Sequence, residues 1–255
     1  MKKESIAILG RGKSLKKYSK FSYLFNKVYI VGTFHKEIRK IGIKHFKNKE
    51  IIHVVGRSDW GWRDDLDKKL NISKVQTMYY LYQLKKKENK KFIKRFPNLK
   101  IEFLPEYMTN RGFPLVSREN IRKYSRKYNN YKELCFFFEQ NFKEEIEEGI
   151  KNNGRCRYWP TNGVFAIDLA LMENNDKDCY IFGIDALKSP SYVIYNWEKK
   201  REYNQEKVKN TNKNFEVVSD LIIYHIKELV KEFTLTEFYS ASNIIKIDCS
   251  NWNII

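Results

Sequence analysis

The sequence predicts an α/β protein with a Rossmann-like, mostly parallel sheet flanked by helices, a helical insertion and a lid loop in the C-terminal half. Short β-branched and aromatic runs at 5–9, 28–31 and 51–55 recur about every 20 residues, which is typical of parallel βαβ units. A Gly-x-Gly turn, Gly10-Arg11-Gly12, directly follows the first run. An apolar helical segment at 163–172 leads into another strand-like run at 179–182.

The remaining segments complete a single domain over residues 1–255. Residues 76–148 are predicted to be mostly helical, with a strand at 100–103 between the helical parts. A long helix is expected at 215–233 and a last strand at 235–239. The polar, tyrosine-rich stretch 186–213 has no periodicity, and a loop of that length in a compact domain is usually functional, so we interpret it as a lid.

Charge is the strongest compositional signal. The chain has 49 Lys plus Arg against 31 Asp plus Glu, a net charge of +18, which attracts polyanions such as nucleic acid, an anionic membrane surface or a sugar nucleotide. A Lys-rich codon bias would give the same composition. The basic residues are dispersed and no helix-turn-helix, RNP or zinc motif occurs, so no specific nucleic-acid partner is expected. A basic nucleic-acid-binding α/β protein remains the alternative from another class.

Location and redox state follow from what the chain lacks. No apolar run approaches the roughly 20 residues that span a bilayer. The apolar run near the N-terminus is too short for a signal peptide, so we expect a cytoplasmic protein, with peripheral contact to an anionic membrane as an option. The four cysteines form no C-x-x-C pair, which favours buried thiols over a metal or redox site.

The turn at Gly10, Arg11, Gly12 and Ser14 is the first candidate binding site. A glycine turn between a strand and a helix lets backbone N–H groups approach a phosphate, and Ser14 suits an N-cap or a hydroxyl contact. Leu15 stands where the dinucleotide fingerprint has its third small residue, and no acid follows the second strand, which argues against NAD. A tight turn without a ligand is the alternative interpretation.

Several segments, taken in order, resemble the bacterial lipooligosaccharide sialyltransferases of glycosyltransferase family 42. The first turn reads G-R-G-K-S-L-K at 10–16, where that family has G-N-G-P-S-L-K. Residues 161–171 read T-N-G-V-F-A-I-D-L-A-L and lead into Y-I-F-G-I-D at 180–185, in the manner of the family's central signature. Ser-Pro-Ser-Tyr at 189–192 stands at the family's lid, and K-N-T occurs at 209–211.

The resemblance implies a transferase that moves sialic acid, or a related ulosonic acid, from a CMP-activated donor to a glycan or glycolipid acceptor. It implies inverting, metal-independent transfer with no cofactor. The first turn would hold CMP, and Gly32 and Thr33, at the end of the second strand, would line the same site. The phosphate or sugar would lie near Thr161, Asn162 and Gly163, with the cation of Arg157 close by. Tyr192 matches a lid tyrosine that binds the departing phosphate.

The general base is not assigned by the resemblance. Where the family has a histidine before K-N-T, this chain has Glu206, Lys207 and Val208. His35 follows the second strand at the expected ligand edge and is the preferred base candidate, with an ordinary loop histidine as the alternative. Asp185 is equally well explained as a base, an acceptor-binding carboxylate or a cap.

Other candidates carry less weight. Asp65-Leu66-Asp67 superficially matches a metal-binding D-x-D but sits at an apparent helix start, so no metal site is predicted. His225 lies on the apolar side of the last helix and reads as a core histidine. The sequence therefore favours a CMP-sugar-dependent glycosyltransferase, with another nucleotide-sugar transferase or a nucleotide-binding pseudoenzyme on the same scaffold as alternatives.

Overall fold

The structure is a computed structural model. It describes residues 4–32, 34–55, 75–80, 100–103, 105–108, 111–114, 116–125, 127–128, 131–153, 157–159, 161–188, 192 and 212–255.

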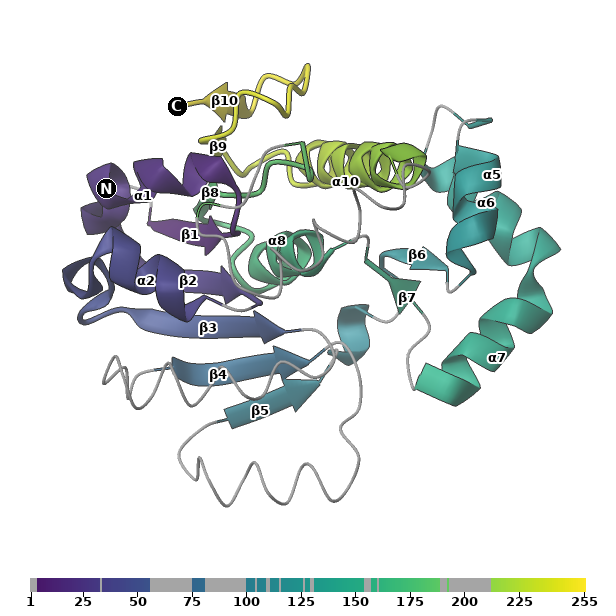
Figure 1. Cartoon of the computed structure of the whole chain (residues 1–255), viewed down its shortest axis with the longest axis horizontal. Helices are drawn as coiled ribbons and strands as arrows, with labels where there is room; N and C mark the ends of the chain where they lie inside the picture. The colour runs from purple at the N-terminus through teal and green to yellow at the C-terminus, as the bar shows by residue number, and fades with distance from the viewer. Residues whose placement is uncertain are drawn as a thin grey trace.

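An eight-stranded sheet forms the centre of the described part of the chain (Figure 1). Every pairing in it is parallel. Its strand order is β10-β9-β8-β1-β2-β3-β4-β5, and the strands are β1 (Ser5–Leu9), β2 (Phe25–Val31), β3 (Glu50–Val55), β4 (Val75–Tyr80), β5 (Lys100–Phe103), β8 (Asp178–Phe182), β9 (Phe238–Ser240) and β10 (Trp252–Ile254). The order reverses between β1 and β8, and ligands of open α/β sheets bind at the carboxyl ends of the strands beside such a switch point.

The two faces of the sheet are covered by different sets of helices. One face carries η1 (Lys13–Lys17), α1 (Tyr18–Phe21), η2 (Ser22–Leu24), α2 (His35–Ile41) and η3 (Ile43–Phe46). The other face packs against α8 (Asn162–Glu173) and α10 (Asn212–Glu232). Strand β1 shows the alternation that this requires, because Ile6 and Ile8 join the α8 core whereas Ala7 and Leu9 join the core beneath η1 and α2.

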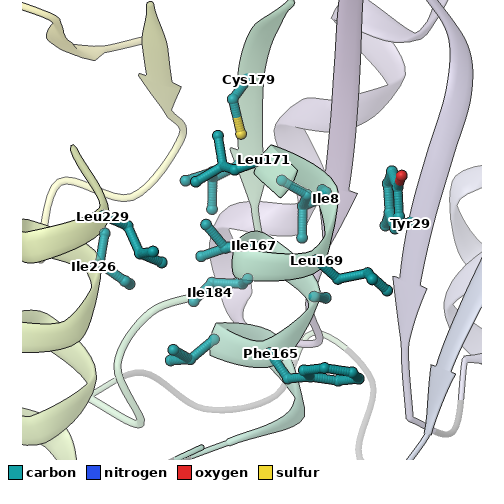
Figure 2. Close-up of a cluster of buried hydrophobic side chains, with 14 of the residues drawn as sticks. Ile8, Tyr29, Phe165, Ile167, Leu169, Leu171, Cys179, Ile184, Ile226 and Leu229 are labelled. Carbon is teal, nitrogen blue, oxygen red and sulfur yellow. The ribbon is translucent and has the colours of Figure 1, made fainter. Parts of the chain in front are cut away.

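Helix α8 is the central buried helix of the second core. Figure 2 shows it between the sheet and α10, with Phe165 and Leu169 on the side of Tyr29, and Ile226 and Leu229 reaching it from α10. Thr161 caps its first turn by accepting a hydrogen bond from the Val164 N–H at 3.4 Å. Because apolar surface covers both sides, every residue from 163 to 171 is buried.

A helical region lies beyond the carboxyl ends of the strands (Figure 1). It contains α5 (Arg118–Ser125), α6 (Tyr131–Asn141) and α7 (Lys143–Asn153), which surround a small aromatic core with Phe113 and Phe138. The antiparallel pair of β6 (Phe113–Pro114) and β7 (Arg157–Tyr158) and the short helix η4 (Glu106–Met108) connect this region to the sheet. Helix α10 contacts α5, α6 and α8, so it joins the region to the main core.

Most of the predicted elements are confirmed. The α/β class, the parallel sheet, the helical insertion and the strands at 5–9, 51–55 and 179–182 are all present, and the β2 strand begins three residues earlier than expected. The helical interpretation of 76–80 is wrong, because Val75–Tyr80 forms an inner strand between β3 and β5. Strand β10 and the β6–β7 pair were not expected, since two or three residues carry no periodicity. Of the lid at 186–213, only 186–188, 192 and 212–213 are described.

The turns that follow β1 and β8 pack directly against each other. The Gly10 N–H donates to the Phe182 carbonyl and the Gly12 N–H to the Gly183 carbonyl, both at 2.7 Å. A Cβ at Gly10 would lie 2.8 Å from the Ile184 side chain, and a Cβ at Gly183 would collide with the Gly10 carbonyl. Gly183 also has a φ of +69°, in the left-handed region. Glycine is therefore required in both turns for the strands to end side by side.

We expect Gly183→Ala to lower the free energy of unfolding by about 3 kcal/mol or more, because the new methyl group meets backbone that cannot move away. Gly32→Ala is the matched control, since Gly32 has a similar φ of +63° but open space where its Cβ would be. The control should cost only about 1–2 kcal/mol for the left-handed backbone. Urea unfolding followed by circular dichroism measures both, and equal losses would show that the contact between the turns is unimportant.

Candidate functional site

Four segments that are distant in the sequence meet at the carboxyl edge of the sheet. The turn after β1 bonds to the turn after β8 through Gly10 and Gly12. The start of α8 joins them, because a Cβ at Gly163 would lie 3.2 Å from Cδ1 of Ile184. Tyr192, from the segment predicted to be a lid, is the fourth, and its N–H donates to the Arg11 carbonyl at 2.6 Å. The sequence placed these segments at one site, and the described contacts join them into a continuous set.

Asp185 caps the first turn. Its carboxylate accepts hydrogen bonds from the Ser14 N–H at 3.1 Å and from the Ser14 hydroxyl, and Ser14 Oγ in turn accepts from the Gly183 N–H at 2.9 Å. Asp185 is only 5% exposed. Of the roles left open by the sequence, this geometry supports the cap. The N-cap of η1 itself is Gly12 rather than Ser14, and Ser14 serves as the link between the two turns.

The same bonds change how the glycine turn could bind an anion. The N–H groups of Gly10, Gly12 and Ser14 all donate to acceptors within the protein. A phosphate at this edge must therefore be held by other donors. A side chain at Gly12 would meet the Asp185 carboxylate and lie 2.9 Å from the Gly183 carbonyl, so substitution there disturbs the fold and cannot isolate ligand binding.

Arg11 forms a part-buried ion pair that the sequence did not suggest. Its Nε donates to Glu37 Oε1 at 2.8 Å, and the Glu37 side chain is fully buried in the first turn of α2. The pair ties the turn after β1 to the helix after β2. His35, the candidate base, is the first residue of the same helix and is 7% exposed. Because α2 begins just after β2, His35 lies at the carboxyl end of that strand, which is the edge where the sequence predicted a ligand.

Tyr192 is seated between the first turn and α2. Lys40 Nζ donates to the Tyr192 carbonyl at 3.0 Å and lies 4.2 Å from the centre of its ring. The ring also packs against the core beneath η1 and α2. Tyr192 therefore lies beside the turn at Arg11, and its contact with the leaving phosphate stays a prediction from the resemblance.

The other candidate residues are placed to different degrees. Thr161 caps α8, and Asn162 begins it at the edge that carries the glycine turns. Arg157 lies in β7, paired with Pro114, and only its backbone is described. Gly32 directly follows β2, a Cβ there would meet open space, and its carbonyl lies 2.8 Å from Nε2 of the buried His53. Thr33, Asp65 and Asp67 lie outside the described residues.

A buried polar cluster around Asp168 was missed by the sequence reading. Asp168, in the middle of α8, accepts from Arg111 Nε at 2.6 Å and from the Trp159 indole at 2.9 Å, and His225 Nε2 lies 3.7 Å away. Burial by itself raises the pKa of Asp168, but His225, Arg111 and the indole N–H outweigh it and lower the pKa. A lone acid within V-F-A-I-D-L-A-L was the available signal, because a buried carboxylate needs partners.

Arg111 extends this cluster to the last helix. Its two terminal nitrogens donate to Glu232 at 2.8 and 3.1 Å, so one guanidinium joins α8 to the end of α10. His225, expected to be a core histidine, is 3% exposed in this environment, and that expectation is confirmed. The cluster fixes α8, whose first residues lie at the candidate site, against the helix that follows the lid.

Metal-binding groups, membrane-spanning helices and pockets also bear on the site. Within the described ranges, no group of three or more His, Cys, Asp or Glu could hold a metal ion, and no helix is long and apolar enough to cross a membrane. A pocket lined by Glu4, Tyr23, Lys27 and Lys177, among others, lies at the amino ends of β1 and β2. That is the opposite edge of the sheet from the glycine turns, so the pocket is not part of this site.

The fold and this edge define a nucleotide-dependent α/β enzyme. A family model described as glycosyltransferase family 29 (sialyltransferase) matches residues 58–226, well over half of the chain. The chain belongs to this family, and it transfers sialic acid from CMP-sialic acid to a glycan acceptor. No curated protein and no solved structure gives a match.

The match confirms the sialyltransferase class that the sequence predicted, but the matching model is that of family 29 and not family 42. Its range includes the candidate residues from Arg157 to Tyr192. The first turn, Gly32, Thr33 and His35 precede the matched residues. The contacts of the first turn with Gly183, Asp185 and Tyr192 connect that turn to the matched part.

We expect Asp168→Asn to lower the free energy of unfolding by about 3 kcal/mol, because it removes one charge from a buried ion pair and leaves Arg111 facing a neutral amide. Glu232→Gln is the matched control, since it breaks the same arginine's bond to an exposed carboxylate and should cost about 1 kcal/mol or less. Urea unfolding at neutral pH measures both. Equal losses would show that the buried half of the cluster has no special weight.

The lowered pKa of Asp168 also fixes the sign of a pH effect. Its contribution is fully present above the usual carboxyl value of about 3.9 and is lost as the pH falls toward the lowered value. In the same experiment repeated in acid, the difference between wild type and Asp168→Asn should therefore shrink. A difference that is independent of pH would contradict this.

Proposed function

We propose that the CMP part of the donor binds at the carboxyl edge of the sheet, over the junction of the β1 and β8 turns. The observation that carries this proposal is the joining of four segments there: the first glycine turn, the start of α8, the Gly183–Asp185 turn and Tyr192. The switch of strand order between β1 and β8 supports the same position. The residue-level likeness to family 42, which extends over the same segments, is part of this proposal.

The phosphate is held by groups other than the glycine N–H donors in this arrangement. The α8 start offers N–H groups at the positive end of a twelve-residue helix, with no acid in its first turn. Arg11 and Lys40 add positive charge beside Tyr192. Arg157 lies in β7, four residues before Thr161, and we retain it as a candidate. Gly32, which directly follows β2, would face the nucleotide, and Thr33 stays a candidate from the sequence.

The transfer step breaks the bond between the anomeric carbon of sialic acid and the phosphate oxygen of CMP. The acceptor hydroxyl oxygen forms the new bond, its proton passes to a base, and CMP leaves with the electron pair. We propose that the Tyr192 hydroxyl donates to the leaving phosphate, and that transfer inverts the anomeric centre without a metal. His35 is our candidate base, because it lies at the ligand edge on the first turn of α2.

The acceptor and the location are also part of the proposal. A glycan or glycolipid presented at the same edge would complete the site. The cytoplasmic location expected from the sequence is retained here as a proposal.

Arg11 allows the donor site to be tested separately from the fold. Arg11→Gln leaves Glu37 buried without its partner, so it should lose both stability and CMP affinity. The double variant Arg11→Gln/Glu37→Gln removes the buried charge and should recover most of the stability. If Arg11 contacts the phosphate, the double variant should still bind CMP about tenfold more weakly, as expected for a charged hydrogen bond. Calorimetric titration with CMP measures this, and full recovery of affinity would assign Arg11 a purely structural role.

Tyr192→Phe tests the leaving-group contact. Loss of one preorganised donor should lower the rate of CMP-sialic acid hydrolysis by roughly 10²–10³ with little change in CMP affinity. Tyr23→Phe, at the opposite edge of the sheet, is the control and should be fully active. With an acceptor present, His35→Gln should abolish the acidic limb of the pH–rate profile, because a general base acts only in its unprotonated form. Wild-type hydrolysis in Tyr192→Phe, or an unchanged profile in His35→Gln, would remove that residue from the mechanism.

A further inference from the structure

Residues 11–49 have an unusual distribution of charge. They contain twelve Lys or Arg and a single acid, Glu37. Glu37 is fully buried and paired with Arg11, so it contributes no negative charge to the surface. The surface formed by this part of the chain therefore carries basic side chains without acidic ones among its own residues. The exposed ones include Lys16, Lys20, Arg39, Lys44 and Lys47.

These residues project from one continuous layer. The elements η1, α1, η2, α2 and η3 all cover the same face of the sheet. Helix α1 and the last element, η3, are joined where Tyr18 packs on Phe46, with ring centres 5.3 Å apart, and where the Tyr18 hydroxyl donates to the His45 carbonyl at 3.2 Å. Ser22 Oγ lies 2.7 Å from His45 Nδ1. The five exposed residues, which we call the basic face, therefore belong to a fixed surface rather than to a mobile tail.

The layer that carries the basic face also has exposed apolar side chains. Tyr23 in η2 is 79% exposed and Ile43 in η3 is 38% exposed, and these two short helices contact each other. Basic residues combined with an aromatic and an aliphatic side chain match the interfacial region of an anionic bilayer, where lysines meet lipid phosphates and the apolar groups enter the headgroup layer. Duplex nucleic acid offers no comparable apolar region on its phosphate surface.

We propose that the η1–α1–η2–α2–η3 layer is a docking surface for an anionic phospholipid membrane. Lys40, which binds the Tyr192 carbonyl, lies at the border of this surface and the candidate donor site. If the proposed function is right, docking would hold the donor site beside lipid-linked acceptors. The binding itself does not depend on that function.

The test is co-sedimentation of the full chain with vesicles of phosphatidylcholine alone or with added phosphatidylglycerol. Wild type should bind only the anionic vesicles, and less so as salt is raised. A variant with Lys16, Lys20, Lys44 and Lys47 changed to Gln should bind at least about a hundredfold more weakly, since each such residue is worth about fivefold near an anionic surface. The matched control changes four exposed lysines elsewhere, Lys123, Lys143, Lys151 and Lys231, to Gln and has the same net charge.

The control should keep most of the wild-type affinity. Equal losses in the two variants would mean that net charge alone governs binding, and no binding by wild type would also overturn the proposal. The pair Tyr23→Ser/Ile43→Ser should weaken vesicle binding and leave any binding to duplex DNA unchanged; binding to DNA but not to vesicles would replace the membrane by nucleic acid. CMP titration of the same variants keeps the two proposals apart, because loss of vesicle binding with normal CMP affinity concerns only the docking surface.

Discussion

The close packing of two glycine turns is the constraint on which the rest of the structure depends. Strands β1 and β8 end side by side at the switch point of the sheet, and their turns must share the space directly beyond it. The N–H groups of Gly10 and Gly12 donate to carbonyls at the end of β8 and in the turn after it, so the two backbones are in direct contact. Gly183 adopts a left-handed conformation in this contact. Ser14 and Asp185 then connect the two turns through their side chains.

This packing decides how a nucleotide can be recognised. In a dinucleotide-binding fold, the glycine turn offers its backbone N–H groups to a phosphate. Here the N–H groups of Gly10, Gly12 and Ser14 are already satisfied. In the site that we propose, the turn would therefore form the floor, and recognition would depend on α8, whose start touches Ile184, and on the side chains around Tyr192. The Asp168 cluster matters because its hydrogen bonds from Arg111 and Trp159 hold α8 in place.

Charge is used in two different ways on the two faces of the sheet. Beneath α10, buried ionic groups are paired and hold helices together, as Arg111 does between Asp168 and Glu232. On the opposite face, the one acid of residues 11–49 is consumed by Arg11 inside the fold. The exposed lysines of the η1–α1–η2–α2–η3 layer therefore have no exposed carboxylate from residues 11–49 beside them.

The sequence by itself determined the fold class, the strands of the switch point, the buried helix α8 and the sialyltransferase class. The fold class, these strands and α8 follow from local patterns, namely short β-branched runs, glycine turns and an apolar helical segment, which depend on neighbouring residues alone. The sialyltransferase class followed from the resemblance of several motifs, taken in order, to a known family. Only the tertiary structure decided that Val75–Tyr80 is a strand, that Asp185 caps Ser14, and that Glu37 and Asp168 are paired. The charged or hydroxyl partners of Glu37, Asp168 and Asp185, namely Arg11, Arg111 and Ser14, lie 26, 57 and 171 residues away. No periodicity records such pairings, because the energy of a buried charge or an inner strand depends on which distant groups the fold brings to it.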